Sequence, residues 1–182
     1  MAEVAEAAPP TISLQNSRRS PVIGDREEEL HEVRCAEREF GLPAGEVASE
    51  TWVMDLFTLS STMVHCHEAR LRVDRVAGSV GMADGVRSDI MLAVGEAVAN
   101  AVEYGNAGDP SGSFTVRCVA IPGRVLVSVS DEGPGFRPDE LPSIEGAMFL
   151  ERGRGIHCMN AVMDEVNFDF ASGTTVRMTK LG

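Results

Sequence analysis

The sequence predicts a two-layer α/β sandwich (α+β), with a mostly antiparallel sheet that carries helices on one face. Two pairs of short apolar segments are each joined by a tight turn, at Pro122-Gly123 and at Ser172-Gly173. Strands joined in this way pair antiparallel. Between the strands, apolar residues recur at spacings of three and four, which is typical of helices that bury one side. Strands mixed with amphipathic helices therefore favour a sheet with one covered face.

The expected elements follow one another without an internal repeat. The folded part begins near residue 50 with a strand at 52–59. A helix at 65–80 and a longer helix at 86–104 come next, and the longer one carries a clear apolar stripe. The remaining elements are strands at 113–120 and 125–130, a Gly- and Pro-rich loop from 131 to about 146, a helix at 153–163, and strands at 166–170 and 175–179.

The first 50 residues differ from the rest in charge. They hold 11 acidic and 5 basic residues, a net charge of -6, which is half of the total of -12. Residues 1–24 have the composition of a flexible tail, whereas 25–40 favour a helix that Asp25 could cap. We expect a flexible acidic arm at 1–49 with a helix at 25–40, and a folded domain at 50–182. The helix is either solvated or docked on a partner or on the domain.

Composition excludes several classes of protein. With 28 acidic and 16 basic residues the chain would repel nucleic acid, so direct DNA or RNA binding is not expected. No apolar run approaches the 18 or so residues of a membrane-spanning helix, and no secretory signal is recognisable at the start. The four cysteines are scattered, without metal-ligand spacing. A cytoplasmic protein with reduced thiols is expected.

The first candidate catalytic and metal-binding residues lie on the helix expected at 86–104. Glu96 and Asn100 are four residues apart and therefore project from one helix face. A carboxylate can act as a general base, and a carboxamide oxygen is a ligand that Mg²⁺ accepts. A solvated polar pair at this spacing would look the same.

Two glycine-rich segments follow. The strand at 125–130 ends in Asp131, and Gly133 and Gly135 come directly after it. An aspartate there can accept a hydrogen bond from an exocyclic amine such as that of adenine, and glycines let the backbone approach a flat ring. Further on, Gly153 and Gly155 open a helix, flanked by Arg152 and Arg154. A helix N-terminus beside arginines suits a phosphate, although a turn and a solvated loop would have the same composition.

The order of these segments resembles the GHKL ATPases, whose members include gyrase, MutL, heat-shock chaperones and histidine kinases. The segment 96–100 resembles the N box, 131–136 the first glycine box, 153–156 the second, and 173–177 the strand whose threonine lies by adenine. The small size and the short span between the glycine boxes resemble the bacterial anti-sigma-factor serine kinases, over about residues 50–182. Tyr104 departs from the histidine that is usual in this family.

The resemblance implies the Bergerat ATP-binding fold and a role for each matching residue. Glu96 would be the base that takes the proton of the substrate hydroxyl, and Asn100 the Mg²⁺ ligand that holds the metal against ATP. Asp131 would read adenine, assisted by Thr174. The nucleotide walls and phosphate contacts would come from Gly133, Gly135, Arg152, Gly153, Arg154, Gly155 and Ile156.

The function implied is that of an ATP-dependent serine/threonine kinase that acts as an anti-sigma factor. It would phosphorylate an antagonist protein and sequester a sigma factor, and a homodimer is compatible with the family. The alternative is a non-catalytic module that senses ATP or ADP and holds a partner. A histidine-kinase fragment is not favoured, because only 28 residues separate His67 from Glu96, too few for a dimerisation hairpin and a linker.

Overall fold

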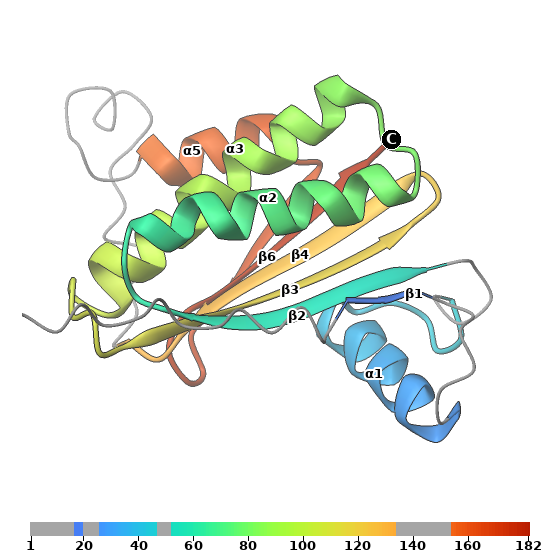
Figure 1. Cartoon of the computed structure of the whole chain (residues 1–182), viewed down its shortest axis with the longest axis horizontal. Helices are drawn as coiled ribbons and strands as arrows, with labels where there is room; N and C mark the ends of the chain where they lie inside the picture. The colour runs from blue at the N-terminus through green and yellow to red at the C-terminus, as the bar shows by residue number, and fades with distance from the viewer. Residues whose placement is uncertain (1–16, 20–25, 47–51, 134–153) are drawn as a thin grey trace, which may run out of the picture.

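Six strands form one antiparallel sheet, and helices lie over both of its faces (Figure 1). The computed structural model describes residues 17–19, 26–46, 52–133 and 154–182. The strand order is β1-β2-β3-β4-β6-β5. The strands are β1 (Ser17–Arg19), β2 (Val53–Ser60), β3 (Ser113–Ile121), β4 (Arg124–Asp131), β5 (Glu165–Asp169) and β6 (Thr175–Leu181).

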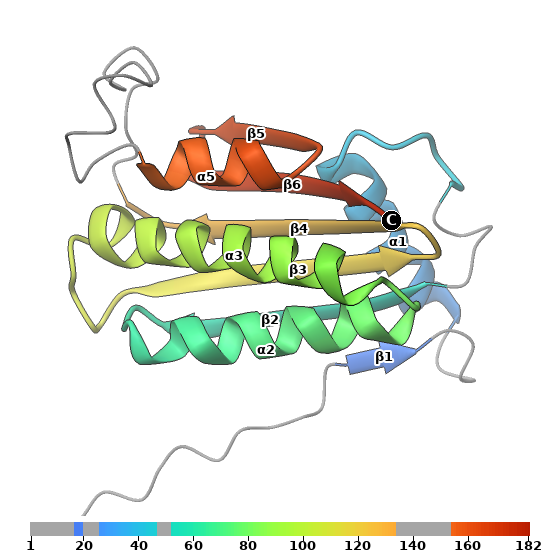
Figure 2. The same ribbon diagram turned by 90° about the horizontal axis from the view of Figure 1, so that it is seen from above.

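Three helices run side by side over one face of the sheet, as Figure 2 shows from above. They are α2 (Val64–Ser79), α3 (Asp84–Asn100) and α5 (Arg154–Val162). The predicted fold class is confirmed. In the described residues, each strand and helix that the sequence predicted within 50–182 is present and within a few residues of its expected bounds.

One predicted helix changes its form near its end. The α-helical part stops at Asn100, and the chain continues as a π-helical turn over Ala101–Gly105 (η2). The backbone N–H of Asn106 donates to the carbonyl of Ala101 at 2.9 Å, a reach of five residues instead of four. Single π turns of this kind are often found at functional sites.

The main core lies between the sheet and the three helices. Strand alternation points every second residue of β3 and β4 toward the helices, where Phe114, Val116, Val125 and Val127 are fully buried. On α3 the buried residues follow the helical stripe expected from the sequence: Ile90, Ala93, Val94, Ala97 and Val98. In the described part of the chain, no helix has the length and apolar character needed to cross a membrane.

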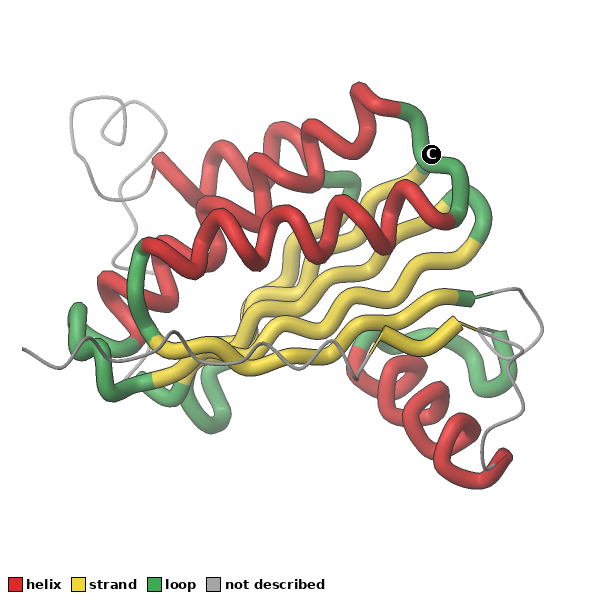
Figure 3. Tube along the Cα trace, viewed as in Figure 1, coloured by secondary structure: helices red, strands yellow, loops and turns green. Residues whose placement is uncertain are grey.

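The first helix lies on the opposite face of the sheet. α1 (Arg26–Glu39) packs beneath the strands, away from α2, α3 and α5, as the tube in Figure 3 shows. The helix expected at 25–40 is thus present. Its C-terminal end is docked on the sheet, because Ala36 is buried there in a second apolar cluster. The two-layer sandwich therefore has a small additional layer, formed by α1, on its second face. The division into an arm and a domain at residue 49 stays a prediction.

A buried ion pair joins α2 to β2. Arg72 donates from Nε and Nη2 to both carboxylate oxygens of Asp55, at 2.8 and 2.7 Å. The Asp55 side chain is 2% exposed and that of Arg72 12%. The guanidinium also lies 3.9 Å from the ring centroid of Phe57. Planar two-point pairing of this kind fixes the helix against the strand.

We expect Arg72→Met to destabilise the protein by about 3 kcal/mol, because it leaves the Asp55 carboxylate buried without its partner. Urea unfolding measures the change. Adding Asp55→Asn to Arg72→Met should recover part of the loss. Arg87→Met breaks a more exposed pair with Asp74 and serves as the control with a smaller cost. Equal losses for Arg72→Met and Arg87→Met would contradict the assignment.

Candidate active site

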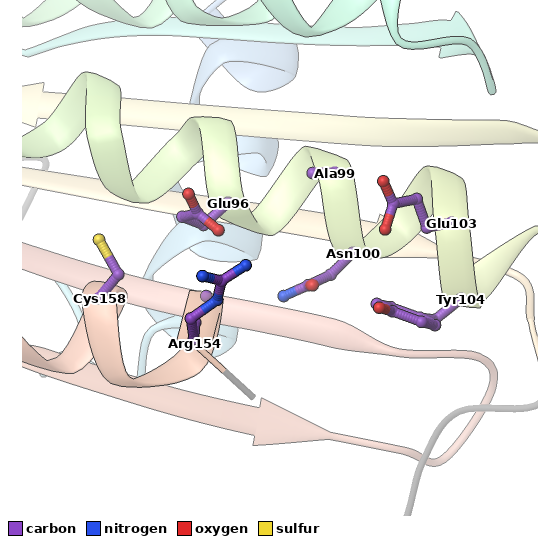
Figure 4. Close-up of a pocket in the computed structure, with 8 residues that line it drawn as sticks. Glu96, Ala99, Asn100, Glu103, Tyr104, Arg154 and Cys158 are labelled. Carbon is purple, nitrogen blue, oxygen red and sulfur yellow. The ribbon is translucent and has the colours of Figure 1, made fainter. Parts of the chain in front are cut away.

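A cavity of about 280 Å³ opens between α3, the π turn and the start of α5 (Figure 4). Helical spacing brings one face of α3 and its continuation to this cavity, because residues three, four and seven positions apart lie on the same side. The side chains of Glu96 and Arg154 enter it from different helices. Its lining residues are Glu96, Ala99, Asn100, Glu103, Tyr104, Arg154, Gly155 and Cys158.

The first turn of α5 lies against the Glu96 carboxylate. A Cβ atom placed on Gly155 would be 2.7 Å from Oε2 of Glu96, so the absence of a side chain at 155 permits this approach. The N–H groups of a first helical turn have no partner within the helix, and the helix dipole favours negative charge there. The cavity therefore places a carboxylate, an amide and an anion-binding helix end together.

Two cysteines near the cavity are held as thiols. Burial raises the pKa of Cys158, and the negative charge of Glu96 raises it further. For Cys66, burial again raises the pKa; the charge of Arg70 lowers it, and that of Glu96 raises it. A thiol with a raised pKa is a poor nucleophile at neutral pH. The groups in this cavity that can accept a proton are therefore its two carboxylates, Glu96 and Glu103, and of these Glu96 lies against the first turn of α5.

Asp131 sits at the end of β4 with its carboxylate largely buried. Its Oδ1 accepts hydrogen bonds from the backbone N–H groups of Gly133 at 2.9 Å and Thr174 at 3.3 Å. Its own N–H donates to the Thr174 carbonyl at 2.9 Å. Burial raises the pKa of Asp131, and the two backbone hydrogen bonds partly offset the rise. From the described residues Oδ2 receives no hydrogen bond, so this oxygen is available to a ligand.

Three glycines pack around Asp131 at distances that no side chain would allow. A Cβ on Gly105 would lie 2.2 Å from Cγ of Asp131, and one on Gly133 would lie 1.7 Å from the Gly105 carbonyl oxygen. Gly173 has a φ of +84°, and its Cβ would lie 1.9 Å from the Asp131 carbonyl oxygen. The ends of the π turn, β4 and the β5–β6 loop therefore meet at one carboxylate.

The π turn connects the two parts of the site. Tyr104 lines the cavity that contains Glu96, and the next residue, Gly105, contacts the Asp131 carboxylate. A substrate that spans both parts would have one end beside Asp131 and the other beside Glu96 and Asn100.

The predicted site residues fall into clear groups. Glu96, Asn100, Arg154 and Gly155 share the cavity, and Asp131, Gly133 and Thr174 form the second cluster. Ile156 packs against the main core and is not among the cavity-lining residues. Three of the predicted residues lie outside the described residues: Gly135, Arg152 and Gly153.

Sequence reasoning did not assign Ala99, Glu103, Cys158 or Gly105 to the site. Ala99 and Glu103 lie three and seven residues after Glu96, so helical spacing alone could have found them. Cys158 follows Gly155 by three on α5 and could have been found in the same way. Gly105 depends on the π turn, for which the sequence carries no comparable signal.

An antiparallel sheet under three helices, with a glycine-lined aspartate beside a glutamate–asparagine cavity, defines a nucleotide-binding ATPase. The chain belongs to the family of the histidine kinase-like ATPase domain, whose model matches residues 59–180. Its relatives include serine-protein kinases. The serine-protein kinase RsbW of Bacillus subtilis is 34% identical over 119 residues, which cover 61% of this chain and 74% of the relative.

Other comparisons agree. The serine-protein kinase RsbW of Listeria monocytogenes is 29% identical over 119 residues and 76% of its length. The crystal structure of the RsbU and RsbW domains of a Mycobacterium tuberculosis protein matches with a TM-score of 0.53 and 26% identity. That match covers 70% of this chain and 32% of the other chain. The predicted resemblance to GHKL ATPases and to bacterial serine kinases of this type is confirmed, and so is ATP as the nucleotide.

We expect the affinity for ADP to fall as the pH is lowered from about 7 toward the ordinary aspartate pKa of about 3.9, and the fall should begin above that value. The raised pKa of Asp131 brings protonation of its acceptor oxygen above the ordinary value near 3.9. The stability of the ligand-free protein depends on pH in the opposite direction. Because the folded-state pKa of Asp131 is raised, its contribution to the free energy of unfolding is fully present below the unfolded-state pKa and is lost as the pH rises through the folded-state pKa.

Calorimetry across this pH range checks the expectation. Asp131→Asn replaces an acceptor oxygen by a group that can present a donor, so it should lose about 2 to 4 kcal/mol of ADP binding at pH 7. Without a titrating carboxylate at position 131, the ADP affinity of the variant should change with pH only as the phosphates of ADP titrate. A wild-type pH dependence no steeper than that of the variant would contradict a role for the Asp131 carboxylate.

Gly105→Ala should weaken ADP binding about 10-fold or more, since a Cβ only 2.2 Å from Cγ must displace the Asp131 carboxylate. Gly85→Ala is the matched control, because Gly85 lies on α3 with nothing within 4 Å of its Cβ position. Both variants should show native far-UV circular dichroism. Wild-type ADP affinity in Gly105→Ala would show that the carboxylate position is not critical.

Proposed function

We propose that this chain is an ATP-dependent serine/threonine-protein kinase that acts as an anti-sigma factor. It phosphorylates an antagonist protein on a hydroxyl side chain and sequesters a sigma factor. The observation that carries the proposal is the single cavity in which Glu96, Asn100 and the N-terminus of α5 meet. The kinase names of the relatives support the same activity.

Glu96 acts as the general base. It enters the cavity from α3 and can take the proton of a serine or threonine hydroxyl that approaches the γ-phosphate. Positioning and electrostatics dominate phosphoryl transfer, so the walls of the cavity matter as much as the base. The N–H groups at the start of α5 and the guanidinium of Arg154 face the space where phosphate charge would lie.

Arginine and backbone groups must meet the phosphate charge, because the chain has one lysine only. Lys180 binds Asp89 at 3.0 Å and also donates to the carbonyl of Val162, so it is engaged elsewhere. Arg154 is the cationic side chain on the described wall of the cavity. This arrangement differs from a P-loop, in which a lysine contacts the phosphates.

The donor set of the cavity fits Mg²⁺. In the described part of the chain no three His, Cys, Asp or Glu side chains gather into a metal site, so the protein ligand would be the amide oxygen of Asn100. When bound together with the nucleotide, Mg²⁺ would neutralise part of the triphosphate charge. Asn100 would then, through the metal, hold the phosphates in a fixed position relative to Glu96.

Asp131 reads the adenine ring. Its Oδ2 can accept a hydrogen bond from the exocyclic amine, while Oδ1 is held by the N–H groups of Gly133 and Thr174. Gly133 and Gly155 supply backbone walls, Thr174 assists at the ring, and Ile156 supports the second glycine box from the core side. A nucleotide sensor without transfer activity would not need Glu96 in the cavity, and it is not favoured.

The partners follow from this activity. The phosphoacceptor would be an anti-sigma-factor antagonist and the sequestered protein a sigma factor, both in the cytoplasm, without direct contact with nucleic acid or membrane. A homodimer is compatible with this function. The catalytic unit would be residues 50–182, with the acidic arm at 1–49 as an accessory segment.

We expect Glu96→Gln to bind ATP within a few-fold of wild type and to transfer phosphate about 100-fold more slowly or worse, the usual contribution of a positioned base. Asn100→Ala should weaken Mg²⁺-ATP binding itself. Labelled ATP, Mg²⁺ and an antagonist encoded by a neighbouring gene provide the assay.

Glu103→Gln is the control variant, because it removes a carboxylate from the same cavity two turns beyond Glu96. It should lose much less activity than Glu96→Gln. Wild-type transfer by Glu96→Gln would refute the base assignment. Tight ATP binding by a wild-type protein that phosphorylates no tested antagonist would move the nucleotide sensor ahead of the kinase.

A further inference from the structure

Lys180, the only lysine of the chain, lies near the end of β6. Val176, Met178 and Lys180 are alternate residues of this strand, so their side chains lie on the face of the sheet that carries the three helices. Val176 and Met178 are buried in the main core, and the side chain of Lys180 is 15% exposed. A charged group so largely removed from water requires polar partners within the protein.

The ammonium group of Lys180 joins two helices to the sheet. Nζ lies 3.0 Å from Oδ2 of Asp89 on α3, and it donates to the backbone carbonyl of Val162 at 2.5 Å. Val162 is the last residue of α5. The final carbonyls of a helix have no partner within the helix, and the negative end of the helix dipole lies there, so a lysine stabilises this end of α5.

A second set of contacts holds the same end of α5 on the same strand. Just beyond the helix, the N–H of Asp164 donates to the carbonyl of Thr179 at 3.0 Å, and the Asp164 carboxylate accepts the N–H of Leu181 at 2.7 Å. Met163, between these contacts and the helix, is 6% exposed. Residues 179–181 of β6 therefore anchor the C-terminal end of α5.

The opposite end of α5 faces the nucleotide cavity. Arg154 and Gly155 belong to its first turn and line the cavity together with Glu96. Figure 2 shows α5 lying alongside α3 above the sheet. The helix has nine residues, so its two ends are only about 12 Å apart along the axis. A short hydrogen-bonded helix transmits a displacement of one end to the other, so the anchored end sets where the first turn lies relative to Glu96.

We propose that Lys180 is a positioning residue for the phosphate end of the nucleotide site. Through Val162 and Asp89 it holds α5 in a fixed place against α3, and this keeps the N–H groups and the guanidinium at the start of α5 beside Glu96. Lys180 is not among the cavity-lining residues, so it acts through the helix and not by contact with the nucleotide. The inference rests on the proposed function, to which it adds a residue outside the cavity.

Calorimetry of the full chain with ADP and with AMP tests this role, because the two nucleotides share adenine and ribose and differ by one phosphate. Lys180→Met should lower the preference for ADP over AMP about 10-fold, and it should change the AMP affinity less than about 3-fold, since only the phosphate end is displaced. Lys180→Arg keeps a cation that can reach the same partners and should recover part of the preference.

A double-mutant cycle separates positioning from a general loss of stability. If Lys180 acts through the first turn of α5, Lys180→Met should cost at least about 3-fold less ADP affinity in the Arg154→Ala background than in the wild type. Arg87→Met is the matched control, because it removes an ion pair that joins α3 to Asp74 on α2 instead of to α5. Its effect on ADP affinity should be small and additive with that of Arg154→Ala.

The contrary results are equally specific. A preference for ADP over AMP that Lys180→Met retains, or a cycle in which Lys180→Met and Arg154→Ala are additive, would overturn the proposal and leave Lys180 a purely structural role. Should Lys180→Met not fold, Asp89→Asn keeps the bond to Val162 but weakens the tether on α3, and it should lower the preference about 3-fold. An unchanged preference in Asp89→Asn would then overturn the proposal. A wild-type protein that binds ADP no better than AMP would refute the phosphate site itself, on which the proposal rests.

Discussion

The close approach of three glycines to Asp131 is the constraint on which the rest of the site depends. Gly105, Gly133 and Gly173 come from three separate segments. A Cβ atom would collide with the Asp131 carboxylate at Gly105, with the Gly105 carbonyl at Gly133, and with the Asp131 backbone carbonyl at Gly173. Because the three segments can meet only in this way, the end of α3, the end of β4 and the entry to β6 converge. The result is one buried carboxylate with one oxygen that accepts no hydrogen bond from the described residues.

The π turn links the Asp131 cluster to the cavity that contains Glu96 and Asn100. The turn starts directly after Asn100. The proposed metal ligand Asn100 and the proposed base Glu96 therefore lie on regular α-helix, whereas Gly105 lies at the end of the π turn, next to Asp131. In the proposed site, one continuous segment anchored on the sheet would thereby set the distance between the adenine end and the phosphate end of the nucleotide. On the other side of Glu96, Gly155 lets α5 close against the carboxylate. The family match and the kinase relatives fit an active site built in this manner.

Much of this arrangement could be predicted from the sequence. Alternating apolar residues located the strands, and the spacing of Glu96 and Asn100 placed both on one helix face, because these patterns follow directly from backbone geometry. The π turn could not be predicted, because a single hydrogen bond from residue i+5 to residue i leaves no periodic pattern in the sequence. The docking of α1 was only one of several alternatives, because Ala36 and Phe40 are too few to define an apolar stripe, and the surface that they cover is contributed by the sheet.

The central claim is that Asp131, packed against Gly105, Gly133 and Gly173, recognises the exocyclic amine of adenine. The most direct measurement is calorimetric titration of the wild-type protein with ADP and with inosine diphosphate, which differ at that amine. The account predicts that inosine diphosphate binds about 10-fold or more weakly, because Oδ2 would face a carbonyl instead of a donor. Equal affinity for the two nucleotides would contradict the account.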